Sequence, residues 1–146
     1  MSSEIFTKIP TGLHSLMNKG YTDGMTDSQF DDLISRAMNE LPQKYIKGLE
    51  NVAIVMEDNP TSEQIIKMKL NSSQLLLGLY EGIPLTNRGS GYNFVLPDKI
   101  TLFKNSIIAV SDDENELFEQ IKRTLWHEIA HYYGLGHGQI DKLQKE

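Results

Sequence analysis

Residues 124–141 read TLWHEIAHYYGLGHGQID, and this stretch decides how the rest of the chain is interpreted. His127 and His131 are four residues apart, so on a helix they lie one above the other on the same face. Two imidazoles at that spacing can bind one zinc ion from the same side. Glu128 lies about 100° further around the helix, where its carboxylate can reach a water on the metal without being a ligand.

The residues after this helix predict a third zinc ligand. Gly134 tolerates a positive φ, so the chain can leave the helix sharply and bring His137 back toward the same ion. Three protein ligands and an open fourth position are typical of catalytic zinc, whereas structural zinc sites are closed. We therefore predict one zinc ion bound by His127, His131 and His137, with Glu128 as the general base of a hydrolase.

The composition excludes several other classes of protein. The chain has 146 residues and no cysteine, which fits one domain without disulfides and leaves His, Asp and Glu as metal ligands. Its net charge is −6, and its Lys and Arg residues are scattered, so no nucleic-acid partner is expected. The start lacks a signal peptide, and no apolar run is long enough to span a bilayer. We expect a cytoplasmic protein without a membrane partner, and the sequence leaves its oligomeric state open.

Apolar periodicity and capping pairs predict helices over residues 26–41, 43–49, 61–74 and 111–133. The capping pairs are Thr26 with Gln29, Thr61 with Gln64, and Ser111 with Glu114. A short, β-branched run predicts a strand over 51–56. Further strands are predicted over 76–81 and 99–104, and residues 107–110 either extend the last strand or turn away. We expect 51–56 to be buried, and we expect 99–104 to be an exposed edge that a substrate strand can join.

Two segments are expected to lie outside this regular structure. Residues 1–25 are predicted to be a loosely ordered N-terminal extension, which leaves residues 26–146 as the domain. Residues 82–99 are rich in Gly, Pro and Asn and form the longest predicted loop. Arg88 in this loop is either a surface charge or a residue that pins the loop near the cleft.

The last helix has a second, apolar face that is expected to pack on the core, formed by Phe118, Ile121, Leu125, Ile129 and Tyr132. We assign core packing to Trp126 as well. The sequence leaves two supporting roles open. Tyr133 either packs or contacts a transition-state oxyanion, and Asp141 is either a solvated tail residue or an acceptor that orients a ligand histidine.

The pattern HExxHxxGxxH resembles the zinc motif of the metzincin metallopeptidases, but no Met follows His137 to form their methionine turn. The chain is more similar to a family of small bacterial zincin-like metallopeptidases, over roughly residues 26–143. The resemblance rests on NELP, NVAIVMED, LLGLYEGIPLTNR, PDKITLF and HEIAHYYG. It implies an α+β zincin-like domain with a short mixed sheet packed on helices and a C-terminal HExxH helix. It also implies zinc as the cofactor and a peptide or protein as the substrate.

Two other functions are compatible with three histidines. One is a metal-dependent endoribonuclease, because a family of small rRNA-maturation proteins has HxxxHxxxxxH spacing. Those proteins lack the glutamate after the first histidine, so Glu128 favours the peptidase, as does the negative net charge. The other is a non-catalytic zinc-binding module, against which the intact glutamate argues.

Overall fold

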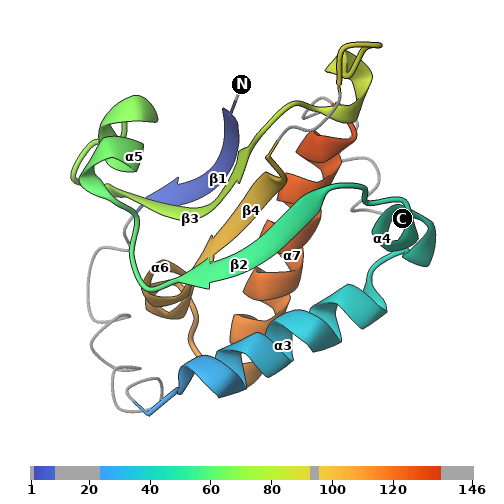
Figure 1. The fold of residues 1–146 in the computed structure, drawn as a ribbon. Helices are drawn as coiled ribbons and strands as arrows, with labels where there is room; N and C mark the ends of the chain where they lie inside the picture. Colours follow the sequence, from blue (N-terminus) through green and yellow to red (C-terminus); the bar gives the residue numbers. More distant parts are fainter. Residues whose placement is uncertain (1, 9–23, 93–95, 136–146) are drawn as a thin grey trace.

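The computed structural model describes residues 2–8, 24–92 and 96–135, and Figure 1 shows their arrangement. A four-stranded sheet contains, in spatial order, β1 (Ser2–Lys8), β3 (Gln74–Glu81), β4 (Asp98–Phe103) and β2 (Val52–Glu57). β3 is antiparallel to both β1 and β4, whereas β2 is parallel to β4. The sheet is therefore mixed, and the predicted α+β class with a short mixed sheet is confirmed.

The helices are α3 (Asp27–Glu40), α4 (Gln43–Lys47), α5 (Ser62–Lys67), α6 (Lys104–Ala109) and α7 (Glu114–Tyr132). A short 3₁₀ helix, η1, spans Leu85–Asn87. Both helices α3 and α7 lie against the same face of the sheet, and α7 packs directly against β1, β3 and β4 (Figure 1). The helix that carries the two histidines therefore lies directly on the sheet.

The prediction that residues 99–104 form an exposed edge for a substrate strand is wrong. Strand β4 lies between β3 and β2, so both of its edges are already hydrogen-bonded and it offers no free edge to a substrate. The edge strands are β1 and β2. Strand β2, which we expected to be buried, is half-buried along most of its length because it pairs on one side only.

Strand β1 lies in the segment that we expected to be an N-terminal extension. Residues 2–8 instead pair with β3, so this part of the segment belongs to the sheet. Residues 9–23 lie outside the described residues, and the proposed domain boundary near residue 25 stays a prediction.

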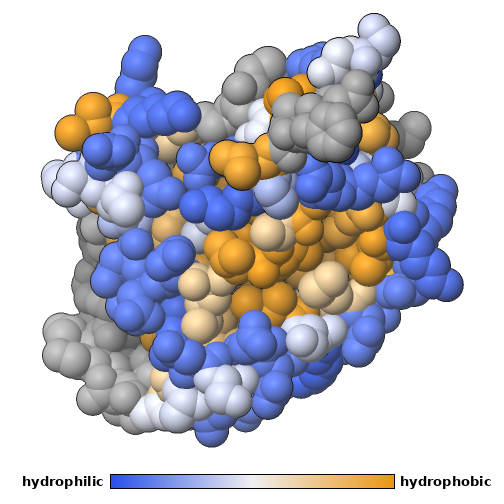
Figure 2. Space-filling view, viewed as in Figure 1, coloured by the Kyte–Doolittle hydropathy of each residue, from blue (hydrophilic) through white to orange (hydrophobic). Residues whose placement is uncertain are grey.

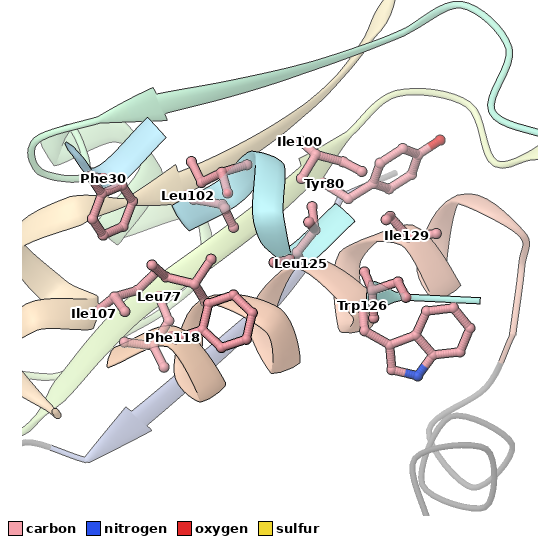
Figure 3. Close-up of a cluster of buried hydrophobic side chains, with 14 of the residues drawn as sticks. Phe30, Leu77, Tyr80, Ile100, Leu102, Ile107, Phe118, Leu125, Trp126 and Ile129 are labelled. Carbon is pink, nitrogen blue, oxygen red and sulfur yellow. The ribbon is translucent and has the colours of Figure 1, made fainter. Parts of the chain in front are cut away.

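The main core fills the space between the sheet and helices α3 and α7 (Figure 3). Ile100 and Leu102 of β4 point into it, whereas Phe103 joins a smaller cluster on the opposite face, as alternation along a strand requires. All five residues of the predicted apolar face of α7 are buried, and so is Trp126. Figure 2 shows an apolar area between β2 and α3, where half-buried residues of β2 pack against this core.

The hydrogen bonds at the helix N-termini test the three predicted capping boxes. The capping boxes of Thr26 and Thr61 are both present, with the glutamine three residues later in each case. The third prediction is wrong, because Asp113 caps α7 by accepting from the Glu116 N–H. The Ser111 hydroxyl instead donates to the Ile107 carbonyl oxygen in α6. Residues 104–109 form that helix, so the apolar run around Ile107 is helical and not an extension of β4.

Candidate metal and catalytic site

The two histidines of α7 converge as their spacing predicted. The Nε2 atoms of His127 and His131 lie 3.0 Å apart, and the ring planes meet at 68°. Two nitrogens that each lie 2.0–2.1 Å from a tetrahedral zinc ion are separated by about 3.3 Å. The two rings therefore fit a shared ion with an adjustment of a few tenths of an ångström.

Glu128 has a different environment from the two histidines. It is fully buried, and it lies on the side of α7 that faces β3. Thr124, one helical turn earlier, is also fully buried on this side. The backbone of the sheet therefore holds the glutamate side chain in place, next to the face that carries His127 and His131.

Gly78 is where the sheet comes closest to this glutamate. A Cβ atom at Gly78 would lie 2.6 Å from Thr124 Cγ2 and 3.4 Å from Glu128 Cγ. The register between β1 and β3 shifts here, since Ile5 pairs with Gly78 but Phe6 pairs with Leu76. Such a bulge bends a strand locally. The irregularity and the missing side chain together bring β3 close to α7.

We expect Gly78→Ala to destabilise the protein by about 1–3 kcal/mol, because the added methyl overpacks the contact with Thr124. Denaturant unfolding measures this change in free energy. Gly89→Ala is the matched control, since a Cβ at Gly89 would meet nothing within 4 Å. Equal stability of the two variants would contradict the close approach of β3 to α7.

The end of α7 has the turn that the sequence predicted. Gly134 has a φ of 78°, the left-handed conformation that favours glycine. The N–H groups of Gly134 and Leu135 donate to the carbonyls of His131 and Ala130, which is the Schellman pattern of a helix C-terminus. The helix therefore ends at Tyr132, the residue that follows the second histidine.

The third predicted ligand, His137, and the candidate supporting residue Asp141 lie outside the described residues. Within the residues that the structure describes, no group of three or more metal-ligating side chains comes together. The fit to zinc thus rests on the pair of nitrogens from His127 and His131.

Tyr133 has a structural contact. Its hydroxyl donates to the Tyr45 carbonyl oxygen at 2.6 Å. Burial, followed by the neighbouring Tyr132 and Tyr45, raises the pKa of the Tyr133 hydroxyl, so it remains a protonated donor at neutral pH. This hydrogen bond holds the helix end against α4 and favours the packing role over a contact with an oxyanion.

Arg88 pins the long loop, which is one of its two predicted roles. Its Nη2 donates to Asp98 Oδ2 at 2.6 Å, and its Nε donates to the Ile83 carbonyl oxygen at 2.9 Å. Burial alone would lower the pKa of the guanidinium, but the hydrogen bond and charge of Asp98 outweigh it and raise that pKa. The interpretation of Arg88 as a surface charge is therefore wrong.

Sequence reasoning missed the partner of this arginine. Asp98 is nearly fully buried and also accepts hydrogen bonds from the Tyr80 hydroxyl and the Ile83 N–H. Its one sequence signal is a charged residue after Pro97, at the junction between the long loop and a strand that is otherwise largely apolar.

Comparison with known proteins assigns the family. The family model described as zincin-like metallopeptidase matches residues 49–146, which include β2, β3, β4 and the whole of α7. The chain belongs to this family. The resemblance drawn from the sequence motifs is thereby confirmed, although the match concerns the family and names no reaction for this member.

A solved structure supports the fold of this zincin-like domain. A conserved hypothetical protein from Thermo thermophilus superposes with a TM-score of 0.51 at 20% sequence identity. The match covers 83% of this chain and 100% of the other. Comparison with curated proteins gives no match. Among the described residues, no helix is long and apolar enough to cross a membrane.

Proposed function

We propose that this zincin-like domain is a zinc-dependent peptidase. The observation that supports it most directly is the 3.0 Å approach of His127 Nε2 and His131 Nε2, beside a buried Glu128 on the same helix. His137 would complete the ligand set from the turn after α7. A peptide or protein substrate, a cytoplasmic location and the absence of nucleic-acid or membrane partners stay predictions from the sequence.

In this proposal the histidines and Glu128 have separate roles in peptide hydrolysis. His127, His131 and His137 would hold the ion, which when bound supplies Lewis acidity to the scissile carbonyl and makes water easier to deprotonate. Glu128 takes a proton from the attacking water and then donates it to the nitrogen of the leaving amine. Gly78 of β3 lies close to Glu128 Cγ, and we expect this packing to limit the orientations of the carboxylate.

The substrate in this proposal adds to the sheet at β1. An extended peptide joins an exposed strand edge through main-chain hydrogen bonds. Of the two edge strands, β1 is the one that packs directly against α7, so a peptide beside it lies close to the histidine-bearing helix. This replaces the predicted pairing with β4.

Metal analysis tests the proposal. We expect the purified protein to contain about one zinc ion per chain, and we expect His127→Ala to lower this to less than about half, because each lost ligand weakens binding strongly. The matched control is His14→Ala, which removes the one histidine outside the motif and should leave the zinc content unchanged. Equal zinc content in the two variants would contradict a site on α7.

A further inference from the structure

Arg88 and Asp98 form a buried ion pair beside the end of the catalytic helix. Their side chains are 6% and 3% exposed, and the charged atoms lie 2.6 Å apart. A carboxylate and a guanidinium are costly to bury, so a pair like this is kept only where its geometry is well satisfied. The Tyr80 hydroxyl and the Ile83 N–H fill further acceptor positions of Asp98. The pair therefore anchors the loop after β3 to the start of β4.

Arg88 also contacts α7, through the ring of Tyr132. Its guanidinium carbon lies 4.9 Å from the centre of the Tyr132 ring and 4.4 Å from that of the Tyr92 ring. A cation over an aromatic face is attracted by the ring, and a planar guanidinium stacks there better than an ammonium group does. Tyr132 is the residue immediately after His131 in the last turn of α7.

The Tyr132 side chain is held at both its ring and its hydroxyl. The Glu50 N–H donates to the hydroxyl oxygen at 3.0 Å, and Arg88 Nη1 donates to the Glu50 carbonyl oxygen at 3.0 Å. The backbone of Glu50, just before β2, is thus hydrogen-bonded to both Tyr132 and Arg88, the two side chains that stack on each other. Any rotation of the last helical turn about its axis would break these contacts together.

A second contact from the same loop reaches the turn after the helix. A Cβ at Gly134 would lie 2.5 Å from Thr86 Oγ1, so the loop packs directly on the glycine that ends α7. Thr86 belongs to η1, two residues before Arg88. The loop therefore fixes the end of the helix at two points, on Tyr132 and on Gly134.

We propose that Arg88 is a positioning residue for zinc binding, which sets the orientation of His131 relative to His127 by fixing the last turn of α7. The inference rests on the proposed zinc function. His131 and Tyr132 share a peptide bond, so the turn that carries one ring also carries the other. In a zinc site the metal–ligand distances lie within about 0.2 Å of fixed values, so the affinity depends on how the two rings are oriented. An arginine that locks this turn therefore raises zinc affinity without touching the metal.

Zinc affinity of the full chain, measured by competition with a chromophoric chelator, tests this role. We expect Arg88→Lys to weaken zinc binding by about tenfold, as loss of an outer support for a ligand typically does. Tyr92→Leu removes one stacking face of the guanidinium and keeps the buried ion pair, so it serves as a milder variant if Arg88→Lys folds poorly. Its expected loss has the same direction and is smaller.

A second readout separates positioning from general stability. The visible absorption of bound Co²⁺ reports the geometry of the ligands and should change in both variants. Ile107→Val is the control, because it removes a fully buried methyl group from α6, at the far end of α7 from His131 (Figure 1), and such a loss costs about 0.5–1.5 kcal/mol of stability. It should lower the melting temperature while zinc affinity and the Co²⁺ spectrum stay those of the wild type.

The outcomes distinguish this inference from the proposed function. Wild-type zinc affinity and Co²⁺ spectrum in both Arg88→Lys and Tyr92→Leu would overturn the positioning role alone. A loss of affinity in Ile107→Val equal to that in Arg88→Lys would also overturn it, since the loss of affinity would then follow the loss of stability. Failure of the wild-type chain to bind zinc would overturn the proposed function and this inference with it.

Discussion

Replacing Glu128 with glutamine is expected to abolish peptide hydrolysis while leaving zinc bound. The carboxamide has nearly the same shape, so it fits the buried position beneath β3, but it has no basic oxygen that can accept the proton of the attacking water. General acid–base catalysis contributes about 10²–10⁴-fold to such rates. We therefore expect the cleavage rate against a peptide library to fall by at least about 100-fold.

The control for this experiment lies on the same helix. Glu119→Gln makes the same chemical change at a side chain that is 58% exposed, and it should retain wild-type activity. Zinc content and melting temperature are measured for both variants, so that a loss of metal or fold is not mistaken for a loss of the base. Cleavage by Glu128→Gln at the wild-type rate would contradict the assignment of Glu128.

The parts of this site that the sequence predicted are those governed by local geometry. Four-residue spacing on a helix brings two rings to one face, and the observed approach of His127 and His131 follows from that spacing alone. Gly134 was likewise predicted as the stop of α7, because a Schellman turn needs a positive φ that glycine adopts without strain. Each of these inferences needs only residues within one helical turn of one another.

Where several local choices compete, sequence patterns were less reliable. Ser111 and Glu114 have capping spacing, but so do Asp113 and Glu116, and α7 begins at the second pair. The Ser111 hydroxyl instead donates to the preceding helix, α6, which the sequence did not predict. A short apolar run such as that around Ile107 fits a strand or a buried helix equally well.

The arrangement of the strands depends on contacts far apart in the chain, and there prediction failed. The apolar run of β2 (VAIVME) is typical of an inner parallel strand, yet β2 lies at an edge, while the less apolar β4 (DKITLF) lies inside. The partner of Arg88 was missed for the same reason. Nothing local shows that Asp98 will be buried beside Tyr80, because that contact exists only once β3 and β4 have paired.

Replacing Asp98 with alanine is expected to destabilise the protein by about 3–5 kcal/mol, because it leaves the charge of Arg88 buried without its partner. The Tyr80 hydroxyl also loses its acceptor. Burial and Asp98 together raise the pKa of this hydroxyl far above its usual value, so it is a protonated donor in the native protein.

Asp27→Ala is the matched control. It breaks the ion pair with Lys104, but Asp27 is 68% exposed, so the expected cost is less than about 1 kcal/mol. Denaturant unfolding of the two variants measures the difference, and an Asp98→Ala variant within about 1 kcal/mol of the wild type would show that the buried pair contributes little to the fold.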